Sequence, residues 1–189
     1  MKHTLTTAAL LAAALNASAA ERALNVETTV KATPREVFRT WTTTEGIKTF
    51  FAPGGVIEPK SNGLYEIHMN PFAPPGERGA DDMRILGLQE DKMLSFTWNA
   101  PPHLPEARKQ RTTVIVRFAP AGDSETRVTL HQTGWGDGGE WDKAYDYFSK
   151  AWPFVLANLK KRFEAGPVDW TPHLTQLKAA MAKAAADKK

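Results

Sequence analysis

The clearest pattern in the chain is a stripe of large apolar residues between Glu140 and Glu164. Its members recur every three or four residues: Trp141, Tyr145, Phe148, Trp152, Val155, Leu159 and Phe163. This spacing places them on one face of an α-helix, opposite a charged face. Gly166 and Pro167 follow directly and favour the end of a helix. The pattern therefore predicts a long helix whose aromatic face packs against a broad surface such as a curved sheet.

The N-terminal part of the chain predicts a strand followed by two short helices. Residues 24–31 alternate between Leu, Val or Thr and polar residues, which is typical of a strand with one solvent-exposed face. Thr33 to Glu36 then combines an N-cap, a proline at the first helical position and a glutamate three residues after the cap. Thr44 to Phe51 indicates a second short helix.

The middle of the chain has the pattern of successive strands. The segments are Val56–Glu58, Leu64–Asn70, Met83–Gln89, Leu94–Asn99, Thr112–Phe118 and Thr126–Gln132. Most links between them are short, which favours an antiparallel meander of six strands. The predicted architecture is therefore an α+β domain in which the sheet packs against the long helix.

Two of the links are long and proline-rich, Pro71 to Gly79 and Ala100 to Lys109. Alternate links of a meander lie at the same end of the sheet, so we expect these two loops to be neighbours. The last strand also ends there. A common mouth at this end would be surrounded by Phe72, His103, Leu104, Trp135 and Trp141.

The two ends of the chain differ from its middle. Residues 1–19 resemble a secretory signal, with Lys2 before an apolar stretch and small residues from Ala17 to Ala19; an ordinary alanine-rich helix is the alternative. We expect a domain at 20–170 and a basic helical tail at 171–189, which holds four lysines and one aspartate. The tail is expected to pack loosely, with surface binding as the alternative.

Composition and charge exclude several classes of function. The net charge of +3 belongs to the leader and the tail, which gives no reason to expect a nucleic-acid surface. The chain has no cysteine, so we expect no disulfide and no lipid-anchored cysteine. The histidines have no paired spacing, and the sequence has no phosphate loop and no nucleophile elbow. We therefore expect no metal, no cofactor, no catalytic residues and no membrane anchor, in a periplasmic or secreted protein.

Four segments carry a resemblance to a known family. They are Thr33-Pro34-Arg35-Glu36-Val37-Phe38 with Trp41 and Thr42, Gly63 to Ile67, Val128 to Trp135, and Trp152 to Leu159. With the order of elements, they resemble the START-like (SRPBCC, polyketide cyclase/dehydrase) superfamily, and within it the activator of Hsp 90 ATPase homologue family. The resemblance spans about Ala23 to Gly166. The apparent export signal and the basic tail depart from the family pattern.

The resemblance implies a helix-grip fold, in which a curved antiparallel sheet wraps around a long C-terminal helix and two short helices follow the first strand. It also implies a cavity between sheet and helix. Strand parity and the helix stripe then give the expected lining: Tyr65, Ile67, Met69, Phe96, Trp98, Val116, Tyr145, Phe148 and Trp152. Arg84 lies on a strand that is apolar on both faces, so it either joins the lining or leans to the rim.

Such a cavity predicts binding of a hydrophobic small molecule. Two alternatives remain open, because this superfamily hosts several activities. One is an enzyme of the cyclase or hydratase kind, in which Tyr65, Arg84 or Tyr145 polarises a carbonyl. The other is a protein-interaction module of the co-chaperone kind. We expect binding rather than catalysis.

Overall fold

The computed structural model describes residues 21–187, so the predicted signal segment, residues 1–19, lies outside the described residues. The chain is an α+β protein, as predicted. Its strands are β1 (Leu24–Val30), β2 (Gly54–Ile57), β3 (Tyr65–His68), β4 (Gly79–Ala80), β5 (Ile85–Gln89), β6 (Met93–Trp98), β7 (Thr112–Gly122) and β8 (Glu125–Thr133). Its helices are α1 (Pro34–Thr42), α2 (Thr44–Lys48), α3 (Pro105–Arg108), α4 (Gly139–Ala165) and α5 (Thr171–Ala186).

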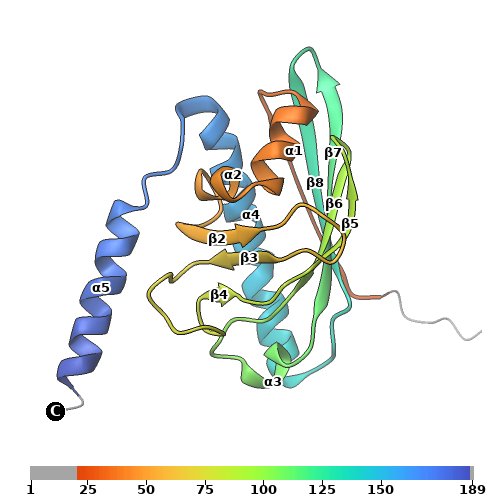
Figure 1. Ribbon diagram of the computed structural model, residues 1–189. Coiled ribbons are helices and arrows are strands. Elements are labelled where there is room, and N and C mark those ends of the chain that lie inside the picture. The colour runs from red at the N-terminus through yellow and green to blue at the C-terminus, as the bar shows by residue number, and fades with distance from the viewer. Residues whose placement is uncertain (1–20, 188–189) are drawn as a thin grey trace, which may run out of the picture.

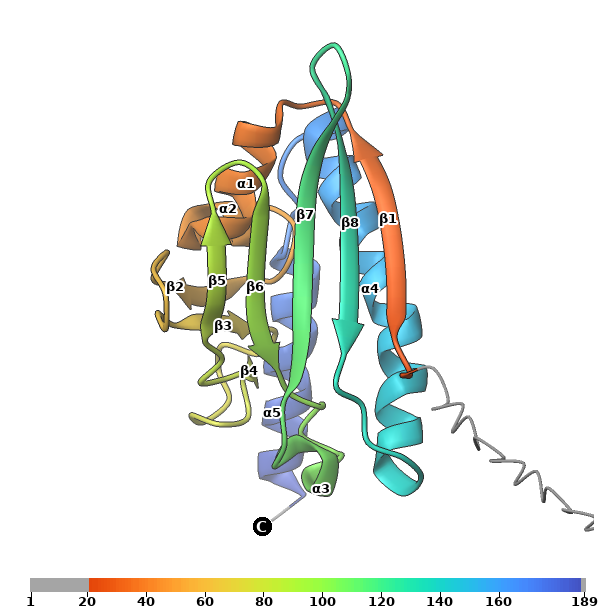
Figure 2. The same ribbon diagram turned by 90° about the vertical axis from the view of Figure 1, so that its right-hand side faces the viewer.

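The main sheet has five antiparallel strands in the order β1-β8-β7-β6-β5. Figure 2 shows its outer face, with β7 and β8 as a long central hairpin. Val114 and Val116 of β7 and Leu130 of β8 are buried on the inner face, whereas Arg117 is exposed on the outer face. The alternation in the sequence thus separates the two faces as predicted.

The prediction of one continuous meander is wrong for the first part of the sheet. Strands β2, β3 and β4 form a separate three-stranded sheet that runs across the main one (Figure 1). The two sheets meet at a bridge between Leu64 and Arg84, where Tyr65 N donates to Met83 O at 2.8 Å and Ile85 N donates to Gly63 O at 2.9 Å. Asp82, which lies between β4 and β5, has a left-handed backbone conformation with φ of 58°. The chain passes from one sheet to the other at this residue, and the apolar pattern does not reveal the change.

The long helix α4 lies against the inner face of the main sheet, as predicted, behind β8 and β1 in Figure 2. Its core-facing residues are Ala144, Phe148, Trp152, Val155, Leu156 and Leu159. Pro153 lies inside the helix and is exposed, where a missing backbone donor does not disturb the buried face. Helices α1 and α2 cover the other part of the same face (Figure 1).

The sequence signals at the start of α1 form as expected. Thr33 Oγ1 accepts a hydrogen bond from Glu36 N, and Glu36 Oε2 accepts one from Thr33 N at 2.9 Å. The two residues satisfy each other's backbone donors, which anchors the helix start. Trp41 on this helix is fully buried and packs on the ring of Phe50 at 5.0 Å between centroids.

One polar side chain in the core joins the sheet to α4. Gln132 of β8 is fully buried. Its amide nitrogen donates to Thr112 Oγ1 at 2.8 Å, and its amide oxygen accepts from Trp152 Nε1 at 2.5 Å. Its backbone carbonyl accepts from Trp135 Nε1 at 3.1 Å. A buried amide with both ends satisfied fixes the helix in register against β7 and β8.

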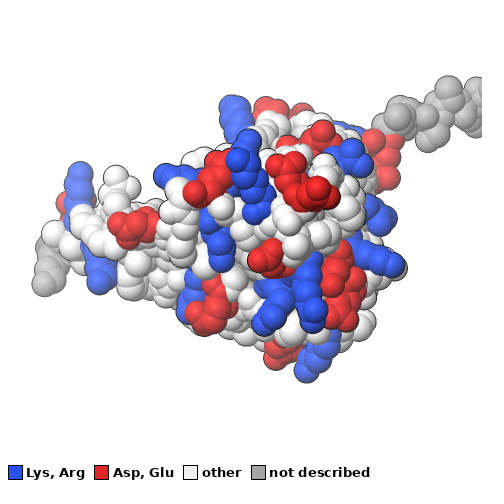
Figure 3. Space-filling model, turned by 90° about the horizontal axis from the view of Figure 1, so that it is seen from above, with Lys and Arg blue, Asp and Glu red and all other residues white. Residues whose placement is uncertain are grey.

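The last helix, α5, touches the domain at a few points and has no buried residue. Trp170 Nε1 donates to Lys48 O at 2.6 Å, and His173 Nε2 donates to Met69 O at 2.9 Å. Within residues 21–187 no helix is long and apolar enough to cross a bilayer. The surface seen in Figure 3 mixes basic and acidic side chains without a large patch of one sign.

Replacing Gln132 by Met tests its role in holding α4. Gln132→Met keeps the volume but leaves the buried Trp152 N–H without an acceptor, so the free energy of unfolding should fall by about 1–3 kcal/mol. Urea denaturation measures the loss. The matched change at an exposed site, Gln110→Met, should alter stability by less than about 0.5 kcal/mol. Equal losses would contradict this role.

Candidate functional site

A cavity of about 250 Å³ lies between α4, the end of β6 and the two long loops. Its apolar walls come from Phe51, Met69, Ala80, Trp98, Ala100, Pro101, Phe148, Ala151, Trp152 and Val155. The remaining lining residues are Asn70, Glu77, Arg78, Gly79, Asn99, Pro102 and Tyr147. Glu77, Pro102 and Tyr147 are exposed, so the cavity opens to the surface beside them.

The floor of the cavity is a cluster of aromatic rings. The Trp98 ring packs against Trp152 at 5.3 Å and against Phe51 at 5.8 Å between centroids. Phe148 stacks on Trp152 at 5.8 Å. Rings held this closely on both sides fix one another, so the floor is preformed. A flat apolar molecule would find rings to pack against there.

The two long loops meet beside this cavity, as the meander argument predicted. Arg108 of α3 joins them. Its Nη2 donates to Gly76 O at 2.7 Å and to Gly79 O at 2.8 Å, and its Nη1 donates to Ala100 O. In the amide orientation that turns its oxygen toward Arg108, Asn99 Oδ1 also accepts from Arg108, at 3.1 and 3.2 Å. One guanidinium therefore holds the backbone of both loops.

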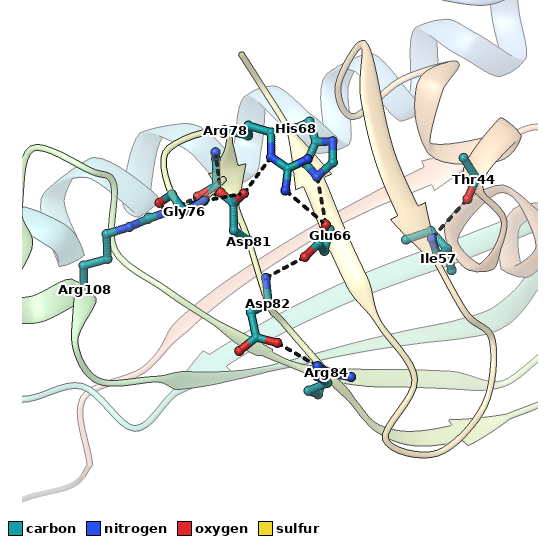
Figure 4. A network of polar contacts seen from close by, with 11 residues as sticks. Thr44, Ile57, Glu66, His68, Gly76, Arg78, Asp81, Asp82, Arg84 and Arg108 are labelled. Carbon is teal, nitrogen blue, oxygen red and sulfur yellow. Dashed lines mark hydrogen bonds and ion pairs between the residues drawn. The ribbon is translucent and has the colours of Figure 1, made fainter. Parts of the chain in front are cut away.

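A network of charged residues supports this junction from behind (Figure 4). Asp81 accepts from Arg78 Nε at 2.9 Å and from the backbone N–H groups of Gly76 and Gly79. Arg108 Nη2 lies 3.6 Å from Asp81. The carboxylate is thus surrounded by donors from one loop and a cation from the other.

Glu66 and His68 extend the network onto β3. His68 Nε2 lies 3.0 Å from Glu66 Oε2, and Arg78 Nη2 lies 3.8 Å from the same oxygen. Glu66 Oε1 accepts from Asp82 N at 3.0 Å. Both side chains are largely shielded from solvent, because the loop that carries Arg78 covers this face of β3.

Burial and hydrogen bonding act in opposite directions on Asp81. Burial raises its pKa, and the hydrogen bonds from Gly76 and Arg78 together with the charge of Arg78 lower it more, so the pKa lies below its ordinary value. Burial lowers the pKa of Arg108, and the neighbouring Asp81 opposes this effect. Asp81 and Arg108 are therefore a charged pair at neutral pH.

The structure brings four of the ten predicted ligand-binding residues to the cavity: Met69, Trp98, Phe148 and Trp152. Tyr65, Ile67, Phe96 and Val116 lie in the filled core instead, where each is fully buried. These four share the predicted face of the sheet, but neighbouring side chains occupy the space beside them. The Tyr65 and Phe96 rings, for example, stack at 4.2 Å.

The three polar groups considered for catalysis have other partners. The Tyr65 hydroxyl donates to Trp41 O at 3.2 Å, and burial raises its pKa well above the ordinary value. The Tyr145 hydroxyl donates to Ala23 O at 3.0 Å. Arg84 lies at the surface, where its Nη2 donates to Asp82 Oδ1 at 2.7 Å, so its side chain does not join the lining. None of the three is among the cavity's lining residues.

The expected mouth residues divide among three places. Leu104 packs with Trp135 and Trp141 in a small cluster around Ala107 and Ala144. His103 lies against the Tyr147 ring at 6.2 Å between centroids, and Phe72 lies beneath Lys178 of α5. Among residues 21–187, no three His, Asp or Glu side chains converge as a metal site.

Arg108→Met tests the connection between the loops. The change leaves Asp81 with one cation fewer and frees three backbone carbonyls, so unfolding free energy should fall by about 2–3 kcal/mol. Amide hydrogen exchange at Gly76 and Gly79 should also become faster. The exposed neighbour offers a control, Arg111→Met, which should leave both measurements nearly unchanged. Unchanged exchange in Arg108→Met would show that the loops are held elsewhere.

The network also predicts a pH dependence. Because the pKa of Asp81 is lower in the folded protein, its contribution to stability is complete above the unfolded pKa of about 3.9. The contribution is lost as pH falls through the folded value. Asp81→Asn should therefore flatten the fall of unfolding free energy below about pH 4. Exposed Asp82 gives the matched variant Asp82→Asn, and an identical flattening there would refute the assignment to Asp81.

Comparison with solved structures finds the same fold in proteins of low sequence identity. A Mesorhizobium loti protein is 20% identical with a TM-score of 0.61, over 78% of this chain and 100% of that one. The Aha1 dimer from Colwellia psychrerythraea is 16% identical with a TM-score of 0.59, over 77% and 98%. An HSP90 activator from Plasmodium falciparum is 11% identical with a TM-score of 0.55, over 77% and 97%.

No curated protein sequence matches the chain. The family model described as Activator of Hsp90 ATPase homolog 1-like protein matches residues 31–164, from the end of β1 to the last turn of α4. This match covers more than half of the chain and includes every described strand except β1, together with the walls of the cavity. The chain therefore belongs to the Activator of Hsp90 ATPase homolog 1-like protein family.

Proposed function

We propose that the protein reversibly binds a flat hydrophobic small molecule in the cavity between α4 and the two long loops. The observation that supports this function is the aromatic floor of Phe51, Trp98, Phe148 and Trp152 beneath an opening at the surface. The volume of about 250 Å³ lies just below the range of pockets for drug-sized ligands, which begins at about 300 Å³. A small, flat ligand fits this size better than a long lipid chain.

The cyclase or hydratase alternative has less support. General acid–base chemistry needs a titratable group within reach of the bound molecule. The titratable side chains among the lining residues are Glu77, Arg78 and Tyr147, and Glu77 and Tyr147 lie at the exposed rim. Arg78 is paired with Asp81. We therefore favour binding without chemistry.

The co-chaperone alternative rests on the family and on relatives described as Hsp90 activators. It requires a protein partner, whereas the proposed function requires only the cavity. Measuring the ATPase rate of purified Hsp90 with and without the chain separates the two. Stimulation that survives blocking of the cavity would favour the interaction module.

We also propose that the protein acts outside the cytoplasm. The support is the pattern of residues 1–19, in which a basic start, an apolar stretch and a small-residue end follow one another. N-terminal sequencing of the protein from the periplasmic and secreted fractions tests this proposal. A mature start at Ala20 or Glu21 is expected, and retention of Met1 would refute export.

Filling the cavity tests the binding proposal directly. Ala151 lines the cavity on α4, so Ala151→Trp should place an indole in the space for the ligand. The neutral fluorophore N-phenylnaphthylamine (NPN), a naphthalene that carries one phenylamino ring, is a suitable probe. The variant should bind NPN at least about tenfold more weakly than the wild type in a fluorescence titration.

The control is a matched change on the same helix. Ala157 is exposed, and Ala157→Trp should leave NPN affinity unchanged. Circular dichroism and thermal unfolding verify that both variants fold. Native mass spectrometry of the protein purified from its own host complements the titration by detecting small molecules that remain bound. The proposal is refuted if NPN does not bind or binds Ala151→Trp as well as the wild type.

A further inference from the structure

We infer that the cavity selects ligands carrying an oxygen group that only accepts hydrogen bonds, such as a carboxylate, a sulfonate or a conjugated carbonyl. This inference rests on the proposed function and specifies the chemistry of the same site. The polar end of the cavity is formed by Asn70, Arg78 and Asn99. Their acceptor atoms already have partners, whereas donor groups remain.

Asn99 shows this division most clearly. It is 6% exposed and lines the cavity. Its amide oxygen accepts from both terminal nitrogens of Arg108 at 3.1 and 3.2 Å. An amide carries acceptors at one end and two donors at the other, so the NH₂ group is the end that remains. Among the described residues it has no hydrogen-bond partner.

Asn70 repeats the arrangement from the other loop. Its side-chain oxygen accepts from Phe72 N at 3.2 Å, which closes a local turn. Its NH₂ group has no partner within the described part of the chain. Two amides from different elements thus present the same kind of free group at one cavity.

Arg108 occupies further hydrogen-bond acceptors at the rim of the cavity. The carbonyl oxygens of Gly79 and Ala100 belong to lining residues, and both accept from its guanidinium. Arg78 lines the cavity beside them. Its Nε donates to Asp81 and its Nη2 lies 3.8 Å from Glu66, and its side chain contains no acceptor. Trp98 Nε1, a buried donor on a lining residue, also has no hydrogen-bond partner among residues 21–187.

Two side chains at the opening could act as acceptors, and neither removes the excess of free donors over free acceptors at the polar end. The Tyr147 hydroxyl can donate as readily as it accepts. The Glu77 carboxylate is exposed, where water and salt screen its charge. A ligand oxygen at this end can accept from the NH₂ groups of Asn70 and Asn99, whereas a ligand donor meets side-chain oxygens that already accept hydrogen bonds.

A pair of probes that differ by one group tests the inference. Anilinonaphthalene sulfonate (ANS) has the aromatic framework of NPN with an added sulfonate, an acceptor-only group. The wild type should bind ANS more tightly than NPN. Asn99→Asp keeps the oxygen that accepts from Arg108 and replaces the free NH₂ by an acceptor. This variant should lose ANS affinity by about tenfold or more and retain NPN affinity within about twofold.

Asn70→Asp makes the same exchange on the other loop and should have the same selective effect. Because both variants also add a negative charge, the control is Gln110→Glu, which adds one at an exposed site outside the lining. It should change the affinity for neither probe. Asn70→Asp keeps the inference testable if Asn99→Asp does not fold.

The outcomes separate this inference from the proposed function. Equal changes in ANS and NPN affinity, or a wild type that prefers NPN, would refute the acceptor requirement while leaving the cavity as a binding site. Absence of binding by both probes would refute the proposed function itself. An ANS signal that persists in Ala151→Trp would mean that ANS binds outside the cavity and would also overturn the inference.

Discussion

The arrangement of the whole domain depends on how α4 is fixed against the sheet, and Gln132 provides the specific part of that contact. Apolar packing attracts a helix to a sheet but permits sliding, because rings and aliphatic groups have little directional preference. The buried hydrogen bonds of Gln132 to Thr112 and Trp152 do not permit it. Trp152 is therefore held at a fixed position along β8, and the rings around it form the floor of the cavity.

Polar groups hold the opposite wall in a different way. The loops there have no regular ladder of backbone hydrogen bonds, and Arg108 and Asp81 satisfy their backbone from the side. The charged pair is costly to desolvate, and the many hydrogen bonds around it offset that cost. The cavity thus has one wall fixed by packing and another fixed by a small number of charge-assisted contacts.

The parts of this architecture that follow a period could be predicted from the sequence. Helical spacing predicted α4, and alternation predicted the buried faces of β7 and β8. The capping box at Thr33 was equally readable. The division into two sheets was not predicted, because no apolar pattern marks the point between β4 and β5 where the chain passes from one sheet to the other. Asp82, with its left-handed backbone, lies at that point. Parity also cannot distinguish a side chain facing a cavity from one facing a filled core, which is why Tyr65 and Phe96 were grouped with Trp98.

For the loop side of the cavity, only the location could be predicted from the sequence. Proline-rich composition and loop order placed the two loops at one end, but no periodicity indicated that Asn70, Arg78 and Asn99 would converge. Arg108 belongs to the short helix α3, which was predicted as loop. Its role follows from a tertiary contact between segments far apart in the chain, and a single sequence carries no signal for such a contact.

The division of the cavity into a packed wall and a loop wall has a consequence for how such a protein diversifies. Substitutions in the floor disturb the core of the domain and are constrained by folding. Loop residues such as Asn70 and Pro102 lie outside that core, and insertions there are tolerated more readily. Selection can therefore reshape the entrance while the scaffold stays constant, so descendants of one ancestor can acquire different chemical preferences without refolding.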